Sequence, residues 1–193
     1  MEWKMENIQS WKKKIHVLKD VESKNICEQT MKKIEDFCSG NLYIKASKGI
    51  IHGDLTLRNL IYKKDGHDYD VTGIIDFYDT SISCYIFETA GIICSVLYEA
   101  DFLDLPDLNI CAVTKEILGG YRKEFDLNNV DLNMLFYAVL ARLCALRVLG
   151  GYYIMHRNDV QIHTGINLEK LEIIMKKIWK LGKTKWDEIC LQS

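Results

Sequence analysis

The sequence lacks a large excess of positive or negative residues. Its 193 residues include 25 Lys and Arg against 27 Asp and Glu, which gives a formal net charge of −2. Proteins that bind nucleic acids usually carry a clustered basic excess, so this balance argues against DNA or RNA as a partner. The apolar fraction of 48% is typical of soluble globular proteins. Together with the length, it predicts one domain that is packed throughout.

Paired metal-binding or redox cysteines are also missing, because no C-x-x-C pair occurs among the seven cysteines. Their odd number, on mostly apolar-periodic stretches, predicts reduced thiols in the core, and a zinc site lacks its paired ligands. Residues 1–14 have neither the apolar run nor the small-residue cleavage site of a signal peptide. We therefore expect a cytoplasmic protein.

No long apolar run in the chain is free of charge. The most apolar stretch, 134–155, contains Arg142 and Arg147. Each would cost roughly 2.5 kcal/mol or more at the centre of a bilayer. We therefore expect no membrane partner and a buried helix, with both arginines neutralised by carboxylates. Contact between Arg142 and a substrate is the alternative.

Apolar periodicity predicts a mainly helical chain with a small β-hairpin, in the α+β class. Helical spacing covers most of 6–38, and further helices are expected from 85 onward, at about 110–124, 131–156 and 167–181. The single proline, Pro106, marks a loop between them.

Short strands are expected between the two helical parts. The runs 59–63 and 71–75 form a hairpin around Lys64-Asp65-Gly66, and a further strand is expected at 49–51. The single domain 1–193 thus divides into three segments. These are a helical entry segment at 1–48, a region of loops at 49–84 and a helical pack at 85–193.

Oxygen-bearing side chains stand where the expected strands end. Asp54 follows a strand and Gly53, which permits a tight turn, so its carboxylate should face a ligand. Asn59 can return to the same cleft, and Asp76 ends the second strand of the hairpin. Phosphoryl transfer needs a carboxylate to accept the proton of the acceptor hydroxyl, and oxygen ligands for Mg²⁺. The pattern predicts Asp54 as catalytic base, with Asn59 and Asp76 as magnesium ligands.

The spacing H-x-D-x-x-x-x-N followed by D-F is the loop pattern of protein kinases, except that Gly53 replaces arginine and Tyr78 replaces glycine. With these departures, the segments 51–55 and 73–77 resemble the aminoglycoside phosphotransferase and choline kinase family. The continuation from Asp76 through 85–90 looks most like the hydroxylysine kinase branch. Where many members have aspartate-proline after this loop, the present sequence has Cys84-Tyr85.

This resemblance implies the C-terminal lobe of a protein-kinase-like fold that acts on the hydroxyl of 5-hydroxy-L-lysine. The phosphate donor would be GTP, or else ATP, and the cofactor Mg²⁺, so the expected partners are a small-molecule substrate and a nucleotide. By motif position, Asp54 would be the base, Asn59 and Asp76 the metal ligands, and His52 a brace for the loop. Asp79 matches a supporting or substrate-binding position.

Glu88 and Arg142 also match positions of the branch and are candidates for supporting or substrate-binding roles. For Glu88, one turn into a helix, two plainer explanations stay open: attraction to the positive helix end, or an ion pair with Arg142. The acidic stretch from Glu99 to Asp107 could attract a cationic amino acid, although a solvated acidic surface is the more common explanation.

The sequence before His52 does not resemble a kinase N-terminal lobe. In such a lobe, two strands flank a loop that covers the phosphates, and a lysine on a strand pairs with a glutamate. The sequence before His52 shows no such unit, so we expect the N-terminal β lobe to be absent. Because phosphate positioning supplies much of the rate in this chemistry, a second hypothesis stands beside the kinase. It is a truncated, catalytically inactive kinase-like fragment with a binding or regulatory role.

Overall fold

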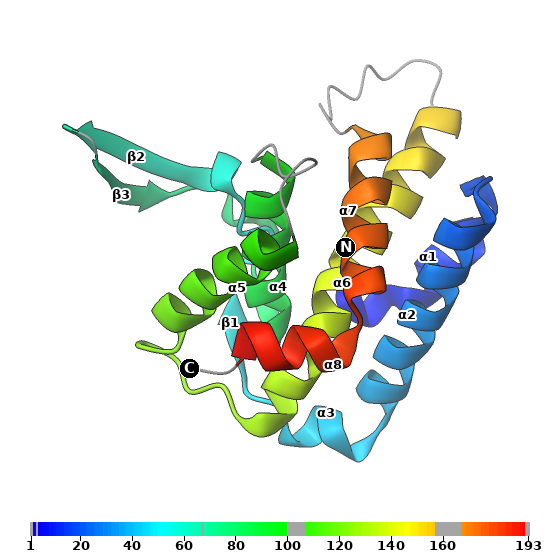
Figure 1. Ribbon diagram of the computed structural model, residues 1–193, viewed down its shortest axis with the longest axis horizontal. Coiled ribbons are helices and arrows are strands. Elements are labelled where there is room, and N and C mark those ends of the chain that lie inside the picture. The colour runs from blue at the N-terminus through cyan, green and yellow to red at the C-terminus, as the bar shows by residue number, and fades with distance from the viewer. Residues whose placement is uncertain (1, 3, 67, 100–106, 157–166, 192–193) are drawn as a thin grey trace.

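The computed structural model describes residues 2, 4–66, 68–99, 107–156 and 167–191 (Figure 1). Eight α-helices occur within these ranges: α1 (Ile8–Lys14), α2 (Val21–Ser39), α3 (Asn41–Lys45), α4 (Tyr85–Glu99), α5 (Asp107–Tyr121), α6 (Asn129–His156), α7 (Leu168–Leu181) and α8 (Lys183–Trp186). The strands in the same ranges are β1 (Lys48–Ile51), β2 (Leu60–Asp65), β3 (Asp68–Ile74) and β4 (Ser81–Cys84). The expected mainly helical α+β class is confirmed, whereas Pro106 lies outside the described residues.

Helix α6 is the centre of the core, and α1, α2, α4 and α7 pack around it (Figure 1). Its side chains are apolar on all sides, which is the pattern of a helix buried in a protein interior. Among the described residues, α6 is also the helix with the length and composition to cross a membrane. Of its most apolar window, 72% is buried inside the structure. The burial agrees with the expected core helix.

The entry segment folds as periodicity predicts, and its second helix begins at a side-chain cap. Asp20 accepts a hydrogen bond of 2.7 Å from the backbone N–H of Ser23 and so satisfies a free amide at the start of α2. Ile26, Met31 and Ile34 then turn one face of α2 into the core, where none of them is exposed. This packing fixes the helical body from which the loops extend.

The hairpin β2–β3 projects away from the helical body (Figure 1). Its ladder continues beyond the strands, because the backbone N–H of Ile75 donates to the carbonyl of Asn59 over 3.0 Å. The base of the hairpin therefore holds Asn59 and Ile75 side by side. This brings Asp76, the next residue, to the same end of the hairpin as Asn59.

A second two-stranded sheet was not predicted. β1 pairs antiparallel with β4, and the register sets Ile51 opposite Ser81. The strand β4 escaped the sequence analysis because it is four residues long and runs directly into α4. Its pairing matters for the site, because it draws the loop after β1 and the loop before β4 together.

The cysteines differ in part from the expectation of seven reduced thiols. Cys111 on α5 and Cys190 near the C-terminus form a disulfide, although 79 residues separate them in the sequence. The remaining five cysteines are free thiols, and four of them are buried. The expectation was wrong for the pair because sequence spacing carries no information on which helices pack together. The cytoplasmic location stays a prediction.

Candidate active site

Two loops meet at the end of the β1–β4 sheet. The first loop, residues 52–59, follows β1, and the second loop, residues 75–80, connects β3 to β4. Gly53 of the first loop has a φ of 83°, and a Cβ at this position would lie 2.4 Å from the carbonyl oxygen of Asp79. No other residue has both the backbone freedom and the absence of a side chain that this contact needs. This close contact explains why the sequence has glycine at position 53, where protein kinases have arginine.

Glu88 organises the first loop through its backbone. Its carboxylate accepts hydrogen bonds from the N–H groups of His52, over 2.6 Å, and Gly53, over 3.1 Å. The residue lies in the first turn of α4 and is 6% exposed. Of the two plainer explanations, the helix end agrees with this position, whereas the carboxylate bonds to the loop and not to Arg142. Glu88 therefore holds the backbone of the first loop at His52 and Gly53.

His52 connects the two loops and fits the expected brace. Its Nε2 lies 2.9 Å from the carbonyl oxygen of Ile75, and its Nδ1 lies 3.3 Å from the backbone N of Asp54. A carbonyl oxygen only accepts, so Nε2 carries the proton, and Nδ1 accepts from the Asp54 amide. The buried imidazole thereby links the backbone before Asp76 to the backbone of Asp54.

Asp54 and Asn59 are joined within the first loop. The Nδ2 of Asn59 donates to the backbone carbonyl of Asp54 over 2.8 Å and lies 3.4 Å from its Oδ2. The amide thus uses its nitrogen for the loop and keeps its oxygen as the acceptor. Asn59 is 9% exposed, so a buried amide holds the backbone of Asp54.

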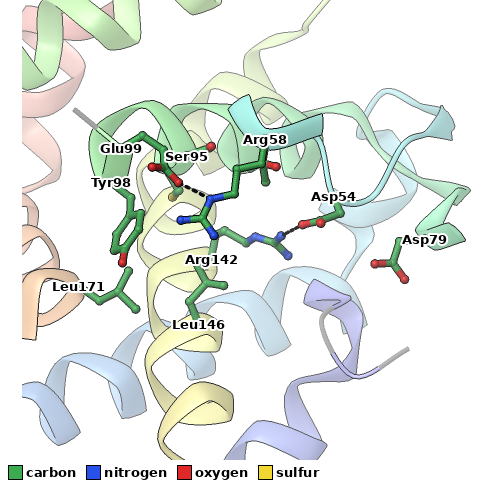
Figure 2. A pocket seen from close by; sticks show the side chains of 12 residues that line it. Asp54, Arg58, Asp79, Ser95, Tyr98, Glu99, Arg142, Leu146 and Leu171 are labelled. Atoms are coloured by element: carbon green, nitrogen blue, oxygen red, sulfur yellow. Dashed lines mark hydrogen bonds and ion pairs between the residues drawn. The ribbon is translucent and has the colours of Figure 1, made fainter. Parts of the chain in front are cut away.

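Arg142 reaches the same carboxylate from the centre of the core. Its Nη2 lies 2.5 Å from Oδ1 of Asp54, and the two side chains are 8% and 36% exposed (Figure 2). The other arginine of α6, Arg147, pairs with Glu172 over 2.6 Å. Both arginines are thus neutralised by carboxylates, as expected. The pairing with Asp54 places Arg142 at the first loop, and the alternative of substrate contact stays untested.

Asp76 has a backbone conformation that few residues adopt. Its φ of 64° and ψ of 59° make it the one residue other than glycine with a positive φ in the described part of the chain. Aspartate tolerates this region better than most residues, and such conformations cluster at functional sites. Its side chain is exposed. Asp76 directly follows Ile75, whose carbonyl oxygen bonds to His52, so its backbone lies next to the first loop.

A cavity of about 290 Å³ opens beside Asp54, and its wall includes Asp79, Arg58, Arg142 and Glu99. Figure 2 shows Asp54 and Asp79 on one side of it, Glu99 on the other, and the two arginines between them. Arg58 and Glu99 form an ion pair, with 2.7 Å between Nε and Oε1. A cavity of this size matches the lower end of small-molecule sites, about 300–1,000 Å³.

The floor of this cavity is a stripe of α4 that the sequence analysis missed. Gly91, Cys94, Ser95, Tyr98 and Glu99 recur at helical spacing and line it together. Of these residues, the sequence analysis had given only Glu99 a possible ligand role, as part of an acidic stretch that could attract a cationic amino acid. Burial raises the pKa of the Cys94 thiol to about 12, so this cysteine stays protonated and is no nucleophile.

Asn59 and Asp76 are the expected metal ligands, and both carry side-chain oxygens near the base of the hairpin. No group of three His, Cys, Asp or Glu side chains that could hold a metal occurs in the described ranges. An amide oxygen and one carboxylate are hard oxygen donors, which suit Mg²⁺ held by few protein ligands together with waters and phosphates. The donor set therefore fits magnesium rather than zinc, which prefers Cys and His.

Comparisons with known proteins identify relatives of this chain. Over 193 residues the chain is 27% identical to a hydroxylysine kinase of Danio rerio, and the match covers 99% of the chain and 52% of that protein. A hydroxylysine kinase of Xenopus laevis is 29% identical over 191 residues, which cover 96% of the chain and 47% of that protein. The chain thus spans about half the length of the curated relatives that it matches.

The structure of a microcompartment-associated aminopropanol kinase aligns with a TM-score of 0.49 at 17% identity, over 99% of this chain and 50% of that one. Residues 8–122, more than half of the chain, match the model of the phosphotransferase enzyme family. This range contains both loops and Glu88. The chain belongs to the phosphotransferase enzyme family.

Proposed function

We propose that this chain provides the phosphoryl-transfer site of a small-molecule kinase. The reaction moves the γ-phosphate of a nucleoside triphosphate, with GTP as the first choice, to the hydroxyl of 5-hydroxy-L-lysine. The observation that carries the proposal is the setting of Asp54, a carboxylate fixed by Arg142 and Asn59 at the edge of a small-molecule cavity. The relatives named hydroxylysine kinase support the choice of acceptor, and the resemblance of the 73–90 region supports GTP.

Asp54 acts as the base in this mechanism. Its Oδ1 is occupied by Arg142, whereas its Oδ2 has only the long contact of 3.4 Å with Asn59. Oδ2 is thus the atom that accepts the proton of the substrate hydroxyl. As that proton leaves, the hydroxyl oxygen forms a bond to the γ-phosphorus, and the bond from the γ-phosphorus to the bridging oxygen of the nucleoside diphosphate breaks.

Arg142 and Glu88 prepare Asp54 for this step without touching the substrate. The guanidinium of Arg142 fixes one carboxylate oxygen and so selects the direction of the other. Glu88 holds the backbone of the loop at His52 and Gly53. Correct orientation of a base before the reaction removes part of the entropic barrier.

Asn59 and Asp76 would hold Mg²⁺ through their side-chain oxygens. When bound there, Mg²⁺ supplies positive charge that neutralises the phosphates of the donor. Asp79 lines the cavity beside Asp54. Its carboxylate is suited to the ammonium group of hydroxylysine that lies on the carbon next to the reacting hydroxyl.

The test is the formation of phosphohydroxylysine from Mg²⁺, GTP and 5-hydroxy-L-lysine, followed by mass spectrometry, with ATP in a parallel reaction. Asp54→Asn should lower the rate about 10²- to 10⁴-fold, because general-base catalysis contributes that much. Asp65→Asn is the matched control, because Asp65 is exposed at the tip of the hairpin and does not line the cavity. Equal product from the parent and the Asp54 variant would refute the assignment of the base.

A second candidate is binding without turnover. The exposure of the second loop favours it: Asp76, Phe77 and Tyr78 are exposed, and Tyr78 is 86% exposed. A nucleotide bound at such a loop would be covered by protein on one side only, and phosphate positioning, which supplies much of the rate, would be incomplete. Calorimetric titration with Mg-GTP separates the two candidates. Micromolar binding without product supports the second candidate, and turnover by the 193 residues excludes it.

A further inference from the structure

The ion pair between Arg58 and Glu99 stands at the far side of the cavity from Asp79 (Figure 2). Arg58 belongs to the first loop, and Glu99 ends α4. Their side chains are 54% and 33% exposed. Exposed ion pairs of this kind contribute about 0–1 kcal/mol to stability. Opening this one ion pair for a ligand with charges of both signs therefore costs the fold little.

Glu99 lies at the end of α4 that is away from Gly91. Gly91 lies under the first loop, since a Cβ there would meet the carbonyl oxygen of Leu55 at 3.7 Å. Glu99 follows eight residues later on the same face of α4. With a rise of about 1.5 Å per residue, the backbone of Glu99 lies about 12 Å further along the helix than that of Gly91, and Arg58 of the first loop pairs with its side chain.

Hydroxylysine extends well beyond its reacting hydroxyl, and Asp54, Arg58 and Glu99 line one cavity. Its carboxylate carbon is five bonds from the reacting oxygen, which is about 6 Å in an extended chain. A hydrogen bond of about 2.8 Å at each end brings the reach to about 12 Å. An acceptor that carries only a hydroxyl and a neighbouring amine would leave the far end of the cavity empty.

The charges of the cavity also match an amino acid with a second amine. Among the described lining residues, the carboxylates of Asp54, Asp79 and Glu99 face the guanidinium groups of Arg58 and Arg142. One negative charge is left in excess. Hydroxylysine has a net charge of about +1 at neutral pH, from two ammonium groups and one carboxylate.

We infer that Arg58 and Glu99 form the binding site for the amino-acid head group of the substrate, an inference that rests on the proposed function. The planar guanidinium of Arg58 binds the α-carboxylate, for which its paired N–H groups are suited. The carboxylate of Glu99 accepts hydrogen bonds from the α-ammonium group. The pair thus selects a hydroxylated amino acid over amino alcohols that lack a carboxylate. A pair that merely braces the loop against α4 would make no such distinction.

Calorimetric titration of the 193-residue chain with three ligands tests this site without any need for turnover. The ligands are 5-hydroxy-L-lysine, 1,5-diaminopentan-2-ol, which lacks the carboxylate, and 6-amino-5-hydroxyhexanoate, which lacks the α-ammonium group. The parent chain should bind hydroxylysine about 10- to 100-fold more tightly than either analogue, as expected for one lost charge-assisted contact.

Two variants assign the contacts. Arg58→Gln should weaken hydroxylysine binding about 10- to 100-fold and leave the affinity for 1,5-diaminopentan-2-ol unchanged. Glu99→Gln should weaken hydroxylysine binding equally and leave the affinity for 6-amino-5-hydroxyhexanoate unchanged. The matched control is Arg122→Gln, because Arg122 is exposed after α5 and does not line the cavity. It should bind all three ligands like the parent.

Three results would overturn the inference. They are equal affinity of the parent for all three ligands, absence of hydroxylysine binding by the folded parent, and equal weakening of all three ligands in both variants. Failure of the proposed function appears differently. Carboxylate-dependent binding without product supports the head-group site while it refutes the kinase, whereas turnover of both hydroxylysine and 1,5-diaminopentan-2-ol at one rate supports the kinase and refutes the site.

Discussion

Replacement of Glu88 by glutamine should destabilise the protein although the side chain keeps its size. In the structure, the two carboxylate oxygens accept hydrogen bonds from the backbone N–H groups of His52 and Gly53. The amide of the introduced glutamine has one oxygen that accepts and an NH₂ group that donates. One backbone N–H of the loop would therefore face a donor, in a setting where Glu88 is 6% exposed.

The expected loss follows from these two bonds. A hydrogen bond to a charged group contributes about 1.5–3 kcal/mol, and a buried donor without a partner costs about 1–3 kcal/mol. The glutamine avoids the burial of a negative charge, which offsets part of the loss. We expect a net decrease of about 2–3 kcal/mol in the free energy of unfolding. For a chain of this size, that lowers Tm by about 4–12 °C.

Urea-induced unfolding followed by circular dichroism measures this change. The matched control is Glu116→Gln on α5, where the side chain is exposed. Substitutions at such positions change stability by about 0.5 kcal/mol or less. Unfolding of the Glu88 variant at the same urea concentration as the control would contradict this reasoning. It would mean that Glu88 does not hold the backbone of the first loop.

Two further predictions concern the first loop and the N-terminal segment. Gly53→Ala should destabilise the protein by about 2–4 kcal/mol, because it adds strain at a positive φ and a contact with the backbone of Asp79. A Tm equal to that of the parent in a thermal melt would contradict the close approach of the two loops. Hydrogen bonds from Lys14 and Tyr153 lower the pKa of Glu2 from 4.5 to about 2. The unfolded chain therefore binds the proton first, so this contribution to stability is complete above pH 4.5 and is lost as the pH falls towards 2. Glu2→Gln should reduce the drop in Tm between about pH 5.5 and about pH 3, and an unaltered drop would argue against the contacts.

The sequence predicted the local parts of this site because local patterns encode local conformation. Helical periodicity located α2, α4 and α6, and the Lys64-Asp65-Gly66 turn located the hairpin. The spacing from His52 to Asn59 predicted the first loop. Because this loop is short, Asp54 and Asn59 lie close together in it. Membership of the phosphotransferase enzyme family followed from the same loops. The roles of Asp54, Asn59 and Asp76 in catalysis stay predictions.

Contacts between distant segments depended on the tertiary structure. Arg142 is 88 residues from Asp54, and the partner that the sequence suggested for it was Glu88. The packing of α6 under the first loop decided for Asp54. The disulfide between Cys111 and Cys190 also depends on which helices pack side by side.

The cavity shows the same division between sequence and fold. Helical spacing from Gly91 to Glu99 is equally consistent with a core stripe and with a cavity floor. Only the position of the first loop above α4 leaves space over that stripe and brings Arg58 to Glu99. The sequence by itself thus determined the family, the loops and the chemical groups available in them. The tertiary structure decided which groups face one another, because side-chain pairing depends on the packing of helices that periodicity locates but does not orient.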